Sequence, residues 1–218
     1  MDLIQAMNER HSVRAYLDKK IEGETLKALQ EEIAKLNKES SLNMQLIIDE
    51  DKAFGGRMAH YGSFRNVKNY IAVVGEKSSD LSERAGYYGE KLVLFAQTLG
   101  LNTCWVAMSY SKGKVAYDLA KGEKLALVIA IGYGQTQGVA HRSRSIEEVS
   151  KSDVTPAPDW FVNGVKAALL APTAINQQKF TFELKDGKVV AKAGIGFYTN
   201  IDLGIAKCHF EIGSGRKI

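Results

Sequence analysis

The sequence has little proline, with 3 residues in 218, and it contains no low-complexity tract. Apolar residues make up 45% of the chain and charged residues 25%, which excludes a disordered or fibrous protein and predicts a globular one. No run of about 20 apolar residues is present, and the start "MDLIQAMNERHS" lacks the regions of a signal peptide. We therefore expect no membrane span and predict a cytoplasmic protein.

Cysteine is also scarce, and the net charge is small. Cys104 and Cys208 stand in the apolar stretches "NTCWVA" and "IAKCHF", which predicts two reduced, packed thiols rather than a disulfide. The 4 histidines are scattered singly, so we expect no metal site. The net charge of +4 is interleaved with acids and does not indicate nucleic-acid binding. A small anionic ligand suits this composition better.

Hydrophobic spacing predicts helices and strands in mixed order. The stretch "ETLKALQEEIAKLN" has one apolar face at helical spacing, and the run from about residue 82 to 99 is typical of a buried helix that Gly100 ends. Strands are expected at "MQLIID", "NYIAVVG" and "LALVIAIGYG". Because strands and helices do not alternate strictly, the sequence predicts an α+β fold with a mixed sheet.

The pattern changes after residue 155, where two prolines follow an acidic, polar stretch. We place a boundary there, between an N-terminal lobe of residues 1–155 and a C-terminal lobe of residues 156–218. In the second lobe, "KFTFEL" and "KVVAKA" flank an Asp-Gly pair, which predicts a hairpin. A last helix is expected to begin after Asn200 as its cap and to end at Gly213.

Residues 9 to 16, "ERHSVRAY", carry two cations and a hydroxyl at alternate positions, Arg10, Ser12 and Arg14. Side chains two positions apart point to the same side of an extended chain, so all three face one ligand if this segment is extended. A later run, "HRSRS", repeats the spacing at Arg142 and Arg144. Arginine binds phosphate through charge-assisted hydrogen bonds. Either the two runs share one phosphate, or they are unrelated, solvated surface arginines.

Two more stretches are informative: "EKLVLFAQTLGLNTCWVA", and "APTAINQQ" at residues 171 to 178. Together with the two basic runs, they resemble the motifs of the FMN-dependent nitroreductase family. The resemblance implies a nitroreductase-like fold, a mixed and mainly antiparallel sheet flanked by helices with a smaller C-terminal α/β lobe. It also implies an oxidoreductase that holds FMN, takes hydride from NAD(P)H and reduces a small electron-poor acceptor such as a nitroaromatic or quinone. It implies no role for a nucleic acid or a membrane.

The resemblance also implies roles for individual residues. Arginines and hydroxyls of both basic runs bind the FMN phosphate, backbone amides after "GLNTCW" face the ring, and the "APTAINQQ" stretch lines its pyrimidine side. The implied cofactor-binding residues are Arg10, His11, Ser12, Arg14, Ala107, Met108, Arg142, Ser143, Arg144, Pro172, Thr173, Ala174 and Asn176. Arg14 is a candidate for the ring edge, and packing is the expected role of His11, with a backbone contact as the alternative. Gly62 and Ser63 are either ring contacts or plain loop.

One departure from the family pattern affects the assembly. In typical members the "PSa.N.Q" motif lies shortly after the second helix, whereas here it follows residue 170, and Phe180 replaces its usual tryptophan. A homodimer and a monomer with a pocket made by one chain are therefore both open. A non-catalytic FMN-binding or storage module, and an interaction domain without cofactor, are the alternative functions.

Overall fold

The computed structural model describes residues 1–218, which form two compact units. The N-terminal unit comprises residues 9–81 and 92–139, and the C-terminal unit comprises residues 1–8, 82–91 and 140–218. Helix α4 therefore contributes its first half to one unit and its second half to the other. The predicted boundary at residue 155 concerns where the chain divides into separately folding parts, and it stays a prediction. None of the helices is long and apolar enough to cross a bilayer.

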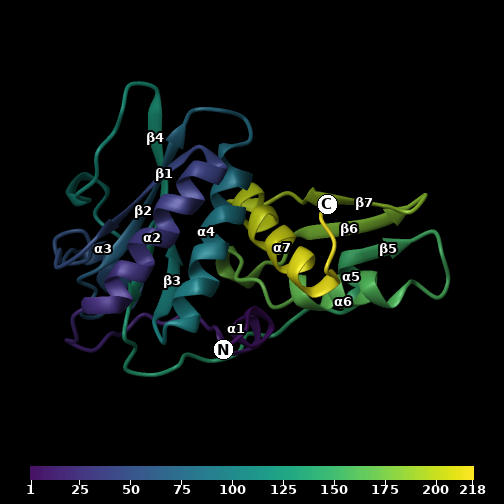
Figure 1. The fold of residues 1–218 in the computed structure, drawn as a ribbon, viewed down its shortest axis with the longest axis horizontal. Helices are drawn as coiled ribbons and strands as arrows, with labels where there is room; N and C mark the ends of the chain where they lie inside the picture. Colours follow the sequence, from purple (N-terminus) through teal and green to yellow (C-terminus); the bar gives the residue numbers. More distant parts are fainter. The chain divides into compact units, whose positions relative to one another are not determined.

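A four-stranded antiparallel sheet is the centre of the N-terminal unit, with the strand order β1-β2-β4-β3 (Figure 1). The strands predicted at three places are confirmed, and the sheet gains β3 from the "NTCWV" stretch. The elements of this unit are α2 (Gly23–Ser40), β1 (Leu42–Ile47), α3 (Arg57–Tyr61), β2 (Tyr70–Glu76), β3 (Asn102–Val106), the 3₁₀ turn η1 (Lys112–Lys114) and β4 (Glu123–Gly132).

Both faces of this sheet are buried, which explains why its central strands are almost wholly apolar. Ala130 of β4 pairs with Tyr70 on one side and with Cys104 on the other, so these three side chains share one face. That face packs on Phe54 and Phe64, whose rings meet edge to face at 5.2 Å. The resulting apolar cluster supports the loops that carry the candidate site.

The two long helices were predicted from their apolar spacing, and both predictions are confirmed. Helix α2 buries Leu29, Ile33 and Leu36 along one stripe. Helix α4 (Leu81–Thr98) ends just before Gly100, which adopts a φ of +76° that glycine tolerates without strain. The chain then turns directly into β3, so the end of α4 fixes where the "TCWVA" stretch begins.

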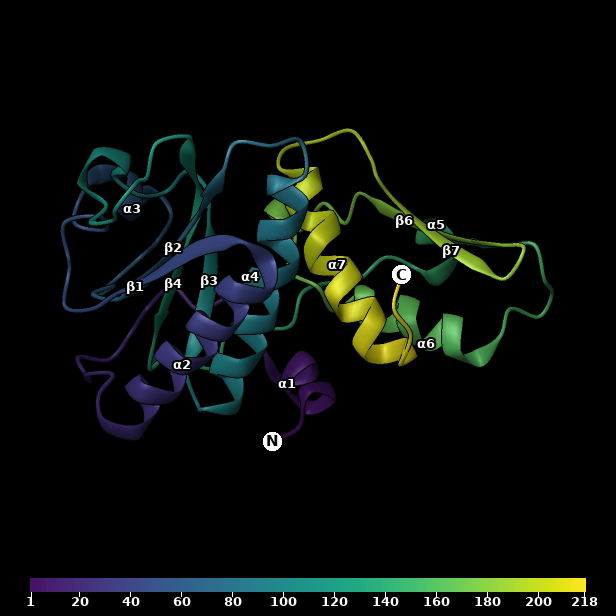
Figure 2. The same ribbon diagram turned by 45° about the horizontal axis from the view of Figure 1, so that its top comes forward.

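The C-terminal unit contains a three-stranded sheet, β5-β6-β7, in which β5 and β6 are parallel (Figure 1). Strands β6 and β7 are antiparallel neighbours (Figure 2). The predicted hairpin is confirmed, with Asp186 and Gly187 both in the left-handed conformation at its turn. The remaining elements are α1 (Leu3–Glu9), α5 (Ile146–Val149), β5 (Ser150–Ser152), α6 (Asp159–Ala168), η2 (Ala174–Asn176), β6 (Phe180–Lys185), β7 (Lys188–Ala193) and α7 (Thr199–Ser214).

Helix α7 is the most buried element of this unit. The ring of Phe210 stacks on Phe182 of β6 at 4.6 Å. Gly204 lies so close to the carbonyl oxygen of Glu83 in α4 that no larger residue fits there. Deeper in the unit, His209 Nε2 lies 2.8 Å from Glu90 Oε1, and both side chains are fully buried. This pair joins α7 to the first half of α4.

The predicted ends of α7 were wrong at both sides. Its N-cap is Tyr198, in a left-handed conformation with a φ of 57°, and Asn200 lies inside the first turn. The helix continues through Gly213 and stops at Gly215, which has a φ of 68°. The apolar spacing predicted the helix itself correctly. Gly213, which was predicted as its end, is a helical residue that packs closely against Ala167.

Candidate functional site

The segment from Arg10 to Tyr16 runs beside the sheet of the N-terminal unit as an extended chain. Ser12 forms a parallel bridge with Thr103 of β3, and the Val13 amide donates to the Thr103 carbonyl at 3.0 Å. Further along, the Tyr16 amide donates to the Arg65 carbonyl at 3.1 Å. The backbone of this segment is therefore extended. This was the condition under which Arg10, Ser12 and Arg14, at alternate positions, were expected to face one side.

The three polar side chains of this segment gather near Cys104. Burial raises the pKa of the Cys104 thiol, whereas the positive charges of Arg14 and Arg10 and a hydrogen bond with Ser12 act to lower that pKa. All three side chains thus lie close enough to the thiol to act on it. Arg10 is only 2% exposed, so its charge is held in a setting of low dielectric, where it attracts an anion strongly.

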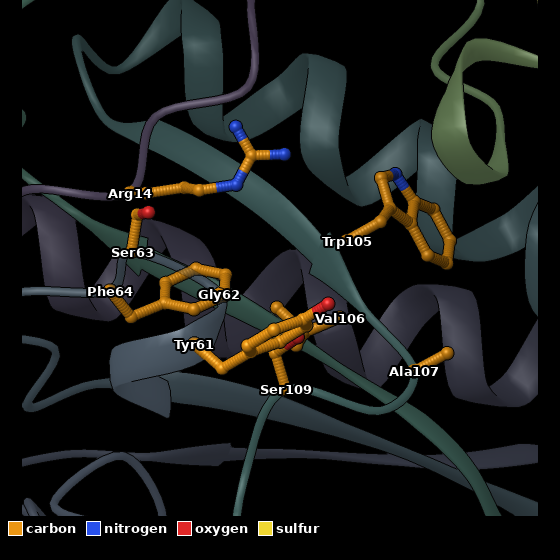
Figure 3. A pocket seen from close by; sticks show the side chains of 9 residues that line it. All are labelled: Arg14, Tyr61, Gly62, Ser63, Phe64, Trp105, Val106, Ala107 and Ser109. Carbon is orange, nitrogen blue, oxygen red and sulfur yellow. The ribbon is translucent and has the colours of Figure 1, made fainter. Parts of the chain in front are cut away.

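A cavity of about 360 Å³ opens beside this segment, and Figure 3 shows the side chains around it. Its volume lies in the range of roughly 300 to 1,000 Å³ that is usual for small-molecule sites. Of the residues predicted for a cofactor, Arg14 and Ala107 line it, and so do Gly62 and Ser63. The full lining is Arg14, Tyr61, Gly62, Ser63, Phe64, Trp105, Val106, Ala107 and Ser109.

Several lining residues were not predicted as site residues. Tyr61 is the last residue of α3 and Phe64 lies in the loop after it, and neither stands in a periodic pattern that would reveal a ring-binding role. Trp105 stands inside a quoted motif, so its indole was visible in the sequence but was given no role. Met108 was predicted but does not line the cavity, and its side chain is 59% exposed. The loop still places it next to Ala107, with the Met108 carbonyl accepting from the Tyr110 amide.

A second cluster lies within the C-terminal unit, where the "HRSRS" run meets the "APTAINQQ" stretch. The Arg142 carbonyl accepts from Asn176 Nδ2 at 2.9 Å and from Gln178 Nε2 at 2.8 Å. The Arg144 amide donates to Gln178 Oε1 at 2.9 Å, and Ser143 Oγ donates to the Leu169 carbonyl at 3.0 Å. The backbone of the arginine run is thus held, while the side chains of Arg142 and Arg144 are exposed.

The turn that holds the arginine run has an unusual backbone. Ile175, Asn176 and Gln178 all adopt left-handed conformations, with φ of 48°, 55° and 46°. Such conformations are uncommon outside glycine, and a β-branched residue rarely adopts one. Observed strain of this kind is frequent at functional sites, where surrounding contacts maintain it.

Buried polar groups maintain this turn. Asp202, 3% exposed, accepts from the Ala174 amide at 3.0 Å and from Gln177 Nε2 at 2.7 Å. Burial raises the pKa of the Asp202 carboxyl to about 6, although both hydrogen bonds act to lower it. Thr173 contributes through its hydroxyl, which accepts from the Gln178 amide at 3.0 Å. Of the other predicted residues in this stretch, Pro172 is buried, and Ala174 is held through its backbone.

Sequence reasoning missed two residues that organise this cluster. Gln178 contacts both ends of the Arg142–Arg144 run, and the only signal was its place in the quoted motif. Asp202 stood out as an acid in the otherwise apolar start of the last helix, and no role was given to it.

His11 packs against the backbone of the N-terminal unit: a β-carbon at Gly138 would lie 2.7 Å from His11 Cβ. No group of three or more His, Cys, Asp or Glu side chains is placed to hold a metal ion.

Comparison with known proteins gives a consistent set of relatives. The profile of a family described as "Putative TM nitroreductase" matches residues 2–214. The structure of a "putative nitroreductase" from Thermotoga maritima is 24% identical in sequence and has a TM-score of 0.71, covering 98% of this chain and 83% of the other. Among curated proteins, none matches the chain.

Two further structures show the same fold at lower identity. A "putative nitroreductase" from Desulfovibrio desulfuricans, in complex with FMN, is 20% identical with a TM-score of 0.55, and covers 72% of this chain and 99% of the other. A "putative NADH oxidase" from Clostridium acetobutylicum is 19% identical with a TM-score of 0.51, and covers 68% of this chain and 97% of the other. These likenesses confirm the predicted α+β fold with a mainly antiparallel sheet.

Proposed function

Since the chain belongs to the family described as "Putative TM nitroreductase", we propose that it is an FMN-dependent oxidoreductase. In this proposal it takes electrons from NAD(P)H and passes them to a small electron-poor acceptor of the nitroaromatic or quinone type. The FMN complex of the Desulfovibrio relative supports the cofactor, and the NADH oxidase relative supports the electron donor. The observation that carries the proposal is the cavity that Arg14, Trp105 and Ala107 share with the loop at Gly62.

The residues around this cavity fit a flavin. Aromatic rings from Tyr61, Phe64 and Trp105 provide flat apolar surface, and Arg14 provides a cation at the same cavity (Figure 3). A cation beside the ring stabilises negative charge that develops there on reduction. The backbone at Ala107 and Met108 is assigned to polar atoms of the ring edge. The assignment of the Ala107 and Met108 backbone to the ring edge follows from the family resemblance and from the position of Ala107 in the cavity lining.

The phosphate is assigned to the basic runs. Arg10 and Ser12 lie together in the N-terminal unit, and the buried guanidinium of Arg10 suits a dianion. The resemblance assigns Arg142, Ser143 and Arg144 to the same phosphate. Within the C-terminal unit their backbone is held, and the side chains of Arg142 and Arg144 are exposed. Pro172, Thr173, Ala174 and Asn176 are assigned to the pyrimidine side of the ring on the same basis.

Bound FMN supplies the electron-transfer chemistry itself, so the protein has to provide position and charge rather than a nucleophile. This agrees with the residues present. The lining of the cavity contains a guanidinium, rings, hydroxyls and backbone, but no carboxylate or histidine that would act as a general base. Arg14 supplies positive charge beside the ring, and Tyr61, Phe64 and Trp105 supply surface for it to pack against.

Spectra of the purified protein test the proposal. We expect absorbance at the flavin bands that bleaches when NADPH or NADH is added without oxygen, and that returns when 1,4-naphthoquinone is added. Colourless protein that takes up no added FMN would refute the cofactor assignment. Flavin that stays oxidised with both nucleotides would instead favour a storage module.

A double variant tests the phosphate assignment. Arg10→Ala with Arg144→Ala should lower FMN retention by at least tenfold, because one charge-assisted hydrogen bond contributes roughly 1.5 to 3 kcal/mol. Lys27→Ala with Lys124→Ala removes the same charge from exposed positions on α2 and β4 and should leave retention unchanged. Equal FMN content in both double variants would contradict the assignment.

A further inference from the structure

A second cavity, of about 470 Å³, lies in the N-terminal unit next to the cavity described above. Its volume is also within the range of roughly 300 to 1,000 Å³ that is usual for small-molecule sites. The side chain of Phe64 lines both cavities, so the two adjoin at this ring (Figure 3). We call the cavity at Arg14 and Trp105 the first cavity and this one the second. None of the roles assigned so far uses the second cavity.

One stretch of chain, residues 60–68, forms a wall of both cavities. Residues 61–64 line the first cavity, whereas His60 and residues 64–68 line the second. The Arg65 amide donates to the Arg14 carbonyl at 2.9 Å. Backbone pairing thus places Arg65 of the second cavity beside Arg14 of the first. This relation lies wholly within one compact unit.

The shared wall is ordered without a ligand. Ser63 and Asn66 adopt left-handed conformations, with φ of 61° and 54°. The Ser63 amide donates to the His60 carbonyl at 2.9 Å, and Asn66 Nδ2 donates to the Tyr16 carbonyl at 3.1 Å. Left-handed residues other than glycine are frequent at functional sites. A wall ordered in advance loses less conformational entropy when a ligand binds.

The lining of the second cavity offers three kinds of group. Apolar surface comes from Phe54, Phe64 and Val67. Hydrogen-bond donors with actual or potential positive charge come from His60, Arg65 and Lys68. The one carboxylate in the lining is that of Asp51. A complementary ligand has a flat ring, an anionic group and hydroxyl donors. A nucleoside 5′-monophosphate has these three as its base, its phosphate and its ribose.

The other charges near the second cavity decide which residues recognise a ligand. Three acids flank the cavity without lining it, and each has a partner of its own: Asp18 with Lys68 at 2.7 Å, Glu50 with the Tyr70 hydroxyl at 2.8 Å, and Asp49 with Lys20 at 3.7 Å. Phosphate recognition is therefore assigned to the exposed Arg65, whose guanidinium binds phosphate oxygens through charge-assisted hydrogen bonds. The carboxylate of Asp51 accepts from ribose hydroxyls and disfavours a 2′-phosphate.

We infer that the second cavity binds the adenosine monophosphate half of the electron donor, and that this donor is NADH rather than NADPH. The nicotinamide half of the same molecule then lies toward the first cavity, across Phe64. The inference rests on the proposed function for the identity of the ligand as a donor. It assigns the phosphate to Arg65, the ribose to Asp51, and the adenine to Phe54, Phe64 and Val67.

Binding of a nucleotide fragment tests the site directly. We expect 5′-AMP to bind the FMN-loaded protein in equilibrium dialysis, since bound FMN occupies the phosphate site assigned to the cofactor. Arg65→Gln should weaken AMP binding about tenfold. Arg57→Gln changes an exposed arginine of α3 that lines neither cavity, and it should leave AMP binding unchanged. Absence of AMP binding to the wild type, or equal binding by Arg65→Gln, would overturn the inference.

A second fragment tests the role of Asp51. Adenosine 2′,5′-bisphosphate carries the extra phosphate of NADPH, so it should bind the wild type several-fold more weakly than 5′-AMP. Asp51→Asn should remove this preference, and Asp118→Asn, at an exposed position outside both cavities, should keep it. A preference that Asp51→Asn leaves unchanged would refute the assignment of NADH over NADPH to this residue.

Kinetics with a truncated donor connect the site to the reaction. Arg65→Gln should raise the KM for NADH several-fold more than the KM for 1-benzyl-1,4-dihydronicotinamide, which has no adenosine half. Equal changes in both KM values would overturn the inference. Flavin reduced by NADH in a protein that does not bind AMP would keep the proposed function and refute the second cavity as a nucleotide site. AMP binding to a protein whose flavin no nicotinamide donor reduces would refute the proposed function and leave a nucleotide site.

Discussion

The two candidate clusters of this protein are built in different ways. In the N-terminal unit, the Arg10–Tyr16 segment is an extended chain that pairs with β3 and follows regular backbone geometry. In the C-terminal unit, the turn from Thr173 to Gln178 is irregular and left-handed at Ile175, Asn176 and Gln178. The first cluster is positioned by backbone pairing, the second by buried side chains.

This difference teaches where each cluster is vulnerable. Backbone pairing survives most side-chain changes, so substitution of Ser12 or Arg14 should remove a ligand contact and leave the fold intact, whereas Val13 and Tyr16 belong to the core. The turn depends on a few polar groups, Gln178 and Asp202 above all. Changes to them should move several residues at once.

The largest effect is expected at the buried Glu90–His209 pair of the C-terminal unit. Glu90→Ala leaves the buried His209 Nε2 without its hydrogen-bond partner and opens a cavity beside it, which together should lower stability by about 3 to 5 kcal/mol. Hydrogen exchange checks this, because amides of α6 and α7 should lose more protection than those of β2 and β4. Glu31→Ala, at an exposed position on α2, should change neither set. Equal loss of protection in both units would contradict the expectation that Glu90→Ala destabilises the C-terminal unit more than the N-terminal unit.

A pH dependence distinguishes the turn from the extended segment. Because burial raises the pKa of Asp202 to about 6, the folded state holds this proton more tightly than the unfolded state does. Stability should therefore fall as the pH rises from about 4 through 6, by at most roughly 3 kcal/mol. Asp202→Asn should remove that slope in urea unfolding, and Asp159→Asn, an exposed acid of α6, should keep it. Identical slopes in the wild type and Asp202→Asn would contradict this.

Removal of Gln178 should affect the arginine run through its backbone. Gln178→Ala leaves the Arg144 amide and one bond to the Arg142 carbonyl unmade, at a cost of roughly 1 to 3 kcal/mol. We expect lower stability and lower FMN retention together, measured by urea unfolding and flavin fluorescence. Gln30→Ala, exposed on α2, should change neither. A stability loss with unchanged FMN retention would separate the run from the cofactor.

The smallest effect is a gain. Ile175→Asn should raise stability by up to about 1 kcal/mol, because asparagine tolerates the left-handed conformation that isoleucine resists. Ile195→Asn is the matched control, since Ile195 is equally exposed but has no left-handed backbone, and it should give no gain. Equal thermal midpoints for the wild type and Ile175→Asn would show that the turn is unstrained.

Local patterns predicted the regular elements well. The apolar stripe of α2, the strand patterns of β1, β2 and β4, and the Asp186-Gly187 turn were confirmed, because each depends on spacing within a few residues. The ends of α7 were predicted wrongly, since Gly213 serves close packing there rather than helix termination. The cavity was predicted only in part: Arg14 and Ala107 stand in recognisable motifs, whereas Tyr61 at the end of α3 and Phe64 in the loop after it stand in none.

The sequence by itself determined most of the regular α+β elements and the residue types of both basic runs, because periodicity, turn chemistry and charge are local properties of a chain. Only the tertiary structure decided that the Arg10–Tyr16 segment is extended beside β3 and that Gln178 holds Arg142 and Arg144. It also decided that Asp202 holds the turn and that Tyr61 and Trp105 line one cavity. Those contacts join residues tens of positions apart. They form because buried polar groups must find hydrogen-bond partners once the core has brought the segments together.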